Sequence, residues 1–174
     1  MKFRRGFVSN SSSSSFVLAL GRKPESVDDL HRMMFPEGPT SIYAYDHNGI
    51  SSEDAAKTVF KDIQEQEPLT RDALVEEFDS GTVITLDGNG YHSAFPDYPT
   101  GLWDLPKEQQ LAAYAEYGRK TREAAESVAA ELQRAYPDSL FFCVSYSDND
   151  GSYYTTMEHG NVFRNIPNIR ISHH

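Results

Sequence analysis

Residues 9–20 read Ser-Asn-Ser-Ser-Ser-Ser-Ser-Phe-Val-Leu-Ala-Leu. A run of serines is usually a flexible linker, but this run continues without a break into an apolar segment of strand composition. We therefore expect the serines to belong to the fold and residues 14–20 to form its first strand. Gly21 and Pro24 end that strand.

Helix signals occupy much of the chain after this strand. N-cap residues, prolines and apolar residues at three- and four-residue spacing predict four helices. The first lies between Ser26 and Pro36, the second runs from Ser51 or Ser52 to near Pro68, the third from Thr70 to Phe78, and the long fourth from about Pro106 to Tyr136. The long helix carries an apolar stripe that begins at Leu111.

Further strands are expected in the middle and at the end of the chain. Residues 82–86 are rich in β-branched side chains. Residues 140–146 and 152–158 flank Asp150-Gly151, a pair that favours a type I′ turn, so they predict an antiparallel hairpin. Residues 169–172 are short enough to form an edge strand.

Composition and element order together predict the fold class. The 174 residues are 39% hydrophobic and 12% aromatic, which is enough apolar surface for a folded core. We expect one globular domain over residues 1–174. The fold should be α+β, with a small, mainly antiparallel sheet packed against one long and several short helices.

The sequence also predicts where the protein works. No apolar run approaches the ~20 residues needed to cross a bilayer, and the basic start leads into a segment too short and too polar for a signal peptide. The single cysteine, Cys143, excludes an internal disulfide and a multi-cysteine zinc site. We expect a cytoplasmic protein with no membrane partner.

The net charge bears on the partner. A formal charge of −10 disfavours approach to a phosphate backbone, so nonspecific nucleic-acid binding is not expected. Acidity can instead imitate nucleic acid toward a basic protein surface. It can also serve only to keep a small domain soluble.

Candidate catalytic and metal-binding residues lie in the C-terminal third. Glu158 and His159 can supply proton transfer, and His159 with His173 can bind a divalent metal if a final strand brings residue 173 close. In the predicted hairpin, Asp150 would lie roughly 26 Å from Glu158, at ~3.3 Å per residue. The acids near the turn would then be too far away to share an ion with Glu158 and His159. The alternative is that His159 caps a strand end and that His173-His174 is a frayed terminus or the start of an affinity tag.

The serine run is a candidate anion-binding segment. Backbone N–H groups and small hydroxyl donors suit a phosphate or another ligand. The residues are Asn10, Ser11, Ser12, Ser13, Ser14 and Ser15. The alternative is an ordinary exposed strand that leads into the core.

A long irregular segment before the long helix is rich in aromatic residues. Trp and Tyr anchor many protein interfaces. The candidate interface residues are Tyr91, Phe95, Tyr98 and Trp103. These side chains can equally fold down over the sheet as a hydrophobic lid.

Other motifs are incomplete. Asp148-Asn149-Asp150-Gly151 lacks two of the oxygen donors that an EF-hand requires, and Gly88-x-Gly90 lacks the third glycine of a dinucleotide fingerprint. No motif for a nucleotide cofactor is present. Cys143 sits in an apolar segment, where a thiol usually fills the core.

The start and the end of the chain also carry a resemblance. Gly6-Phe7-Val8-Ser9-Asn10, with the serines and Phe16, resembles the N-terminus of a family of uncharacterised bacteriophage and bacterial proteins. The stretch from Tyr146 to Gly151, with Glu158-His159-Gly160 and Ile169 to His173, is similar to a phage-associated subset. The resemblance implies a phage or prophage context in a bacterial host cell. It carries no activity and no catalytic residues.

Two functions are consistent with these observations. The first is a phage-type accessory protein that acts by binding, an acidic module directed at a host protein. The second is a hydrolase or transferase that acts on a phosphorylated small molecule or nucleic acid, with or without a metal. Convergence of the serines and histidines in one pocket would favour the enzyme.

Overall fold

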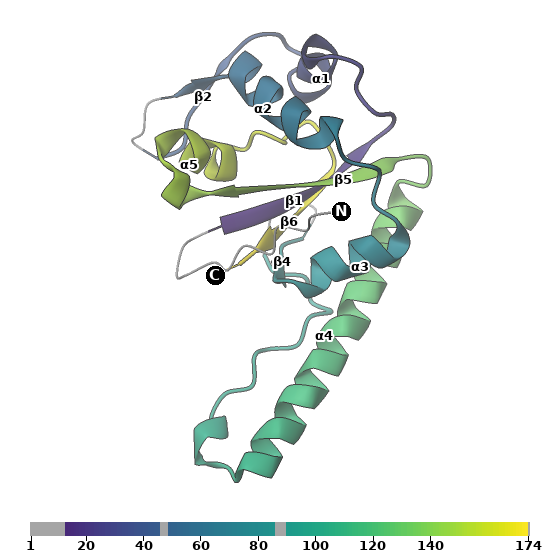
Figure 1. Cartoon of the computed structure of the whole chain (residues 1–174), viewed down its shortest axis with the longest axis vertical. Coiled ribbons are helices and arrows are strands. Elements are labelled where there is room, and N and C mark those ends of the chain that lie inside the picture. Colours follow the sequence, from purple (N-terminus) through teal and green to yellow (C-terminus); the bar gives the residue numbers. More distant parts are fainter. Residues whose placement is uncertain (1–12, 46–48, 86–89, 174) are drawn as a thin grey trace.

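The structure is a computed structural model that describes residues 13–45, 49–85 and 90–173. Its centre is an antiparallel sheet in the order β4-β6-β1-β5. The strands are β1 (Ser13–Leu20), β4 (Thr82–Val83), β5 (Leu140–Ser147) and β6 (Asn168–Ser172). Helices lie on both faces of this sheet, so the fold is α+β as predicted (Figure 1).

One face of the sheet lies beneath three helices, α1 (Val27–Met34), α2 (Ser52–Gln64) and α5 (Ser152–His159) (Figure 1). Phe16 and Leu18 of β1 join their core together with Phe142 and Met157. A two-stranded sheet of β2 (Ser41–Ile42) and β3 (Ile50–Ser51) leads into α2. The predicted N-caps of α1 and α2 are confirmed, because their hydroxyls accept hydrogen bonds from the backbone N–H groups three residues on.

The opposite face carries α3 (Arg71–Asp79) and α4 (Lys107–Ala135). Val17 and Ala19 point toward this side and pack with Phe78 and Leu132. Only the second half of α4 joins this core, since none of residues 107–120 is buried. The first half of the apolar stripe predicted from Leu111 onward therefore lies outside the core, and Figure 1 shows α4 extending away from the sheet.

The predicted hairpin over residues 140–158 is wrong in its second half. After β5 the chain forms a 3-10 turn, η2 (Asp148–Asp150), and then α5 in place of a strand. Gly151 reverses the chain at φ +101°, a conformation that favours glycine. The predicted type I′ turn at Asp150-Gly151 is also wrong, because Asp150 belongs to η2 and does not have the positive φ that such a turn requires.

Burial explains why this β-prone segment is helical. Thr155 and Thr156 are buried, and their hydroxyls bond to the carbonyls of Gly151 and Ser152, at 3.2 and 3.1 Å. These bonds satisfy polar groups that would otherwise be buried without partners. Packing of the helix on β5 therefore overrides the strand preference of its residues.

The predicted edge strand is also corrected. β6 lies inside the sheet, between β1 and β4, rather than at an edge. Within the described part of the predicted strand over residues 82–86, Thr82–Val83 pair in the ladder, and Ile84 forms an isolated bridge to Tyr91. In the ranges that the structure describes, no helix has the length and apolar composition to cross a membrane.

Ser13, Ser14 and Ser15 belong to β1, as the continuous run predicts. They are buried, so the alternative of an exposed strand is wrong for these three residues. Ser14 pairs with Tyr146 on one side and with Ser172 on the other. The serines therefore form part of the central strand of the sheet.

Candidate functional site

Ser14 brings a hydroxyl group into a buried polar cluster on the α5 side of the sheet. This hydroxyl donates a hydrogen bond of 2.8 Å to Oε1 of Glu158 and accepts one of 2.9 Å from Nε of Arg170. Arg170 extends from β6, the neighbouring strand. The alternation of side chains along β1 thus places one serine of the run beside a charged pair.

Glu158 lies in the last turn of α5, and its side chain is 0% exposed. A buried carboxylate is costly unless charged and polar groups surround it. Nη2 of Arg170 lies 3.4 Å from Oε1, and the backbone N–H of Asp148 donates to Oε2 at 3.0 Å. Arg170 and Ser14 both contact Oε1 of Glu158. The other oxygen, Oε2, faces two further residues of the cluster.

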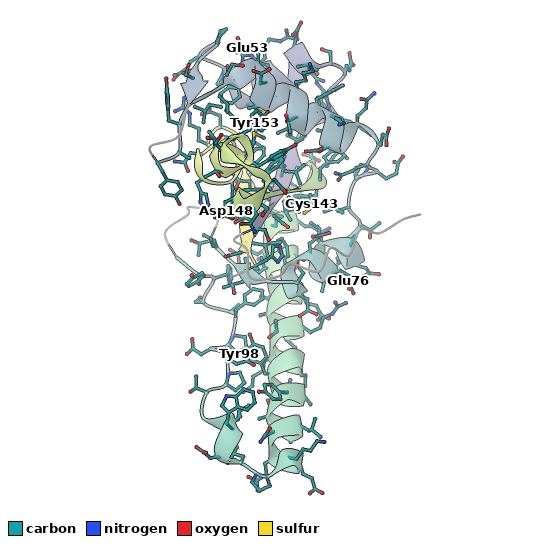
Figure 2. The ribbon with its side chains drawn as sticks, turned by 60° about the vertical axis from the view of Figure 1, so that its left-hand side comes forward. Glu53, Glu76, Tyr98, Cys143, Asp148 and Tyr153 are labelled. Atoms are coloured by element: carbon teal, nitrogen blue, oxygen red, sulfur yellow. The ribbon has the colours of Figure 1, made fainter. Side chains whose placement is uncertain are left out.

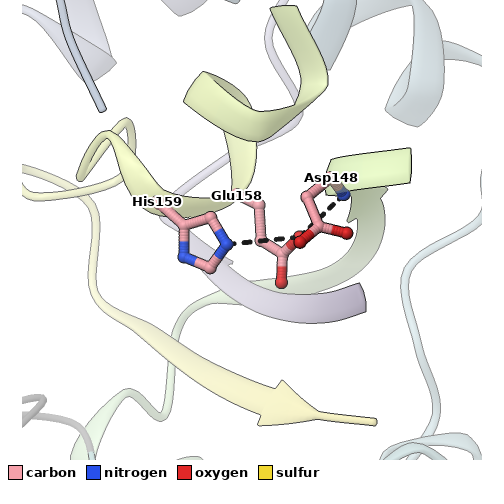
Figure 3. Close-up of side chains that lie close together, drawn as sticks. All are labelled: Asp148, Glu158 and His159. Atoms are coloured by element: carbon pink, nitrogen blue, oxygen red, sulfur yellow. Dashed lines mark hydrogen bonds and ion pairs between the residues drawn. The ribbon is translucent and has the colours of Figure 1, made fainter. Parts of the chain in front are cut away.

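That pair is Asp148 and His159 (Figure 3). Nε2 of His159 lies 3.6 Å from Oε2 of Glu158. One possible ligand atom from each of Asp148, Glu158 and His159 lies within 4.8 Å of the other two. Oδ1 of Asp148 is buried and has no hydrogen-bond partner among the described residues.

The grouping overturns one prediction about distances. Residues near the turn were expected to be too far from Glu158 and His159 to share an ion, which is wrong for Asp148. A helix rises only ~1.5 Å per residue, and α5 folds back against β5, so its last turn returns to η2. Strand alternation would also have separated Glu158 from His159, whereas here their side chains meet.

Tyr45 covers the imidazole of His159. The two ring centroids lie 5.1 Å apart, with the rings tilted by 55°. The backbone of Tyr45 has φ +52°, a left-handed conformation that is uncommon for an aromatic residue and often occurs at functional sites. His159 thus lies between a solvent-exposed ring and a buried carboxylate.

His173 lies on the other face of the sheet. Its Nε2 is 2.8 Å from the hydroxyl of Ser15, which also bonds to Ser145 at 2.7 Å. The predicted pairing of His159 with His173 is therefore not present, because Ser14 and Ser15 point to opposite faces. Nearby, Cys143 donates to Oε2 of Glu77 at 3.3 Å, and burial raises the pKa of this thiol well above its usual range, so it stays protonated at neutral pH.

Two further histidines, His47 and His92, and the start of the serine run bear on whether the serines and histidines converge. Nε2 of His92 lies 3.3 Å from Glu131, beside a cavity of about 470 Å³ whose lining includes Val128 and Leu132. Asn10, Ser11, Ser12 and His47 lie outside the described residues. The serines and histidines that are described thus do not converge in one pocket.

The aromatic segment forms a projecting structure with the start of α4. We call residues 96–118 the arm; it contains η1 (Leu102–Asp104) and the first turns of α4. The ring of Tyr98 packs against Tyr114 and Tyr117, at centroid distances of 6.3 and 5.4 Å (Figure 2). Trp103 is 84% exposed.

The lid alternative for the aromatic residues receives little support from this geometry. Phe95 does pack against the core, at the base of the arm. Tyr91, Tyr98 and Trp103, however, are all exposed. Most of the predicted interface residues therefore face solvent rather than the sheet.

The sequence does not predict three residues of this site, namely Arg170, Asp148 and Tyr45. Arg170 interrupts an apolar strand between Ile169 and Ile171, and a charge at such a position signals a buried partner. Asp148 lies close to Glu158 and His159 because residues 152–159 form a helix, whereas the strand that the sequence predicts there would place them far apart. Tyr45 gives no sequence signal, since its position depends on a backbone conformation that only the structure shows.

The two regions differ in their chemistry. Two carboxylates and an imidazole can bind a metal ion or move a proton, and Arg170 adds a positive charge beside them. The arm offers aromatic and apolar surface, which suits contact with another protein. Comparison of the chain with protein-family models, with curated proteins and with solved structures gave no match.

Proposed function

We propose that the chain is a phage-type accessory protein that acts by binding, and that its arm docks on a basic surface of a host protein. The observation that carries the proposal is the exposure of large apolar side chains on the arm. Trp103 is 84% exposed, Tyr98 is 61% exposed and Leu111 is 60% exposed. The resemblance at the start and the end of the chain supports the phage context.

The arm does not complete the core of the domain. Buried residues of α4 begin at Ala124, so the first 14 residues of the helix, 107–120, contribute none. At ~1.5 Å per residue, this length projects about 20 Å. Exposed aromatic groups on a projecting helix and loop favour a role in contact with a partner.

The charge of the arm favours a basic partner. The arm has four acidic residues and one basic residue, Lys107; the acidic ones are Asp97, Asp104, Glu108 and Glu116. The whole chain has a formal charge of −10. Opposite charge on the partner would speed association, and the apolar residues would then supply the buried contact.

A double variant of the arm and a control variant elsewhere in the molecule test the proposal. Trp103→Ala combined with Leu111→Ala removes apolar surface from the arm, and Tyr43→Ala removes an exposed aromatic residue from another part of the molecule. We expect the wild type and Tyr43→Ala to retain one and the same basic protein from host lysate, and the arm variant to lose it. The affinity of the wild-type chain for the purified basic partner should fall as the salt concentration rises.

Three results would contradict docking by the arm. One is a partner that the arm variant binds as strongly as the wild type does. Another is self-association in sedimentation experiments that Trp103→Ala abolishes, which would make the arm an interface between copies of the chain. The third is binding of nucleic acid through the arm.

The second candidate is a hydrolase or transferase that acts on a phosphorylated small molecule or nucleic acid. The cluster of Glu158 and His159 with Arg170 favours it, because a guanidinium group can bind a phosphate near a general base. Against it, Ser15 and His173 lie on the other face. Phosphate-ester hydrolysis that His159→Ala abolishes and Trp103→Ala does not affect would favour this alternative.

A further inference from the structure

We propose that Asp148, Glu158 and His159 together bind a divalent transition-metal ion of the Zn²⁺ type. The three residues supply two carboxylates and one imidazole, which are common ligands for such ions. The proposal does not depend on the arm, because this cluster belongs to the α5 side of the sheet.

The first support is a distance. Nε2 of His159 and Oε2 of Glu158 lie 3.6 Å apart, which is too long for a good hydrogen bond. Two ligands of a tetrahedral zinc ion, each bonded at about 2.0–2.1 Å, lie about 3.4 Å from each other. The separation in the protein is therefore close to the spacing that one shared ion requires.

The second support is the unsatisfied oxygen of Asp148. Its Oδ1 is buried and has no hydrogen-bond partner within the described part of the chain. Buried polar atoms nearly always have a partner, and an unpaired carboxylate oxygen is among the most expensive to leave without one. A cation next to Asp148 removes this cost.

The third support is the way in which Glu158 is held. Ser14 and Arg170 both contact Oε1, and the backbone N–H of Asp148 donates to Oε2. Carboxylates that bind metals are typically fixed by hydrogen bonds of this kind. Glu158 is therefore oriented before an ion arrives, with Oε2 facing His159.

The charges distinguish between classes of metal. Arg170 offsets one of the two carboxylates, so the cluster is less anionic than most calcium sites. Ca²⁺ and Mg²⁺ also prefer six or more oxygen ligands, whereas His159 offers nitrogen. A transition metal with three protein ligands fits better, and its open position is available to water or to another ligand.

The test uses the full chain after treatment with a chelator. Calorimetric titration with ZnCl₂ should give one bound ion, and thermal unfolding should shift upward as Zn²⁺ is added. Asp148→Asn and His159→Ala should each weaken the binding about tenfold or more. Circular dichroism establishes that both variants remain folded, and Glu158→Gln is avoided because the side chain is buried.

Control variants test whether histidines outside the cluster bind the ion. His173→Ala and His92→Ala alter imidazoles outside the cluster, and both should bind Zn²⁺ as the wild type does. Trp103→Ala should also bind normally, which separates this site from the proposed docking by the arm. Visible absorption of the protein loaded with Co²⁺ should be lost in Asp148→Asn, which reports on the ligand directly.

Several results would overturn the proposal. Absence of Zn²⁺ binding by the wild type would do so, as would equal binding by Asp148→Asn. Loss of binding in His173→Ala would assign the ion to the end of the chain instead. Tighter binding of Ca²⁺ or Mg²⁺ than of Zn²⁺ would contradict the class of metal.

Discussion

Asp62 and Tyr146 form a partly buried hydrogen bond between α2 and β5. The hydroxyl of Tyr146 donates to Oδ2 of Asp62 at 3.0 Å. Burial raises the pKa of Asp62 above its usual value, although the hydrogen bond from Tyr146 acts in the opposite direction. Burial also raises the pKa of Tyr146 well above its usual range, so this hydroxyl keeps its proton.

The raised pKa of Asp62 has a defined effect on stability. A carboxyl group whose pKa is higher in the folded state favours folding below pH 3.8, the ordinary pKa, and loses that contribution as the pH rises through the folded pKa. At neutral pH the ionised group therefore destabilises the fold. Asp62→Asn removes the charge and keeps an acceptor for Tyr146.

We predict that Asp62→Asn raises the melting temperature at pH 7, and that the gain shrinks toward zero as the pH falls below 3.8. Thermal unfolding monitored by circular dichroism at several pH values gives the difference in melting temperature between Asp62→Asn and the wild type. Asp97→Asn changes the net charge equally at an exposed position and is the control. A lower melting temperature for Asp62→Asn at pH 7 would contradict the prediction.

At the residue scale, sequence reasoning identifies side chains more readily than their partners. Glu158 and His159 stand out because a carboxylate beside an imidazole is chemically distinctive. Their partner Asp148 is reached only through the path of the chain, and Arg170 only through the pairing of β6 with β1.

The end of α5 is the element on which the polar cluster depends. A Cβ added at Gly160 would lie 2.5 Å from the carbonyl oxygen of Thr156 and 2.8 Å from Cγ2 of Ile42. The backbone oxygen cannot move without disturbing the helix. His159 immediately precedes this residue, so the position of its imidazole depends on the tight packing.

We predict that Gly160→Ala destabilises the protein by about 1–3 kcal/mol and weakens any ligand binding at His159. The control is Gly118→Ala in the exposed part of α4, where an added Cβ meets nothing within 4 Å. There the change should stabilise the helix by up to ~1 kcal/mol. Urea denaturation of both variants compares the two free energies of unfolding, and the same sign for both would contradict this account.

At the element scale, local sequence signals located α1 to α4, but they predicted a strand where α5 forms. Ser26, Ser51 and Thr70 are N-caps whose hydroxyls form the bonds that the sequence predicts. Residues 152–159 have aromatic and β-branched side chains, yet they form α5 because burial on the sheet decides the outcome. Tertiary packing of this kind leaves no local pattern to read.

The whole molecule is organised around β1, which pairs with β5 on one side and β6 on the other. Fold class followed from composition and element order, but strand order did not. Nothing local in residues 168–172 distinguishes an edge strand from an inner one. Position in the sheet depends on partners that are far away in the sequence.

We predict that a chain ending after residue 160 does not fold. It lacks β6, which pairs with both β1 and β4, and it also loses Phe163 and Ile166 from the core. The loss of so much buried apolar surface is comparable with the whole stability of a domain. A cooperative melting transition of this truncated chain, compared with the full chain by calorimetry, would show that the sheet forms without β6.

The central position of β1 also has a consequence for protein synthesis. The hydrogen bond between Ser15 and Ser145 spans 130 residues, and the contact of Ser15 with His173 spans 158. At a translation rate of about 5–20 residues per second, the ribosome takes roughly 7–26 s to reach Ser145 after Ser15. Until β5 begins to be made the strand has no partner strand, although the helices that cover it are made earlier. Its apolar part, Phe16 to Leu20, can then pair with other nascent chains. The three serines at the start of β1 make that part of the strand polar. This polarity makes β1 less prone to aggregate before its partner strands are synthesised.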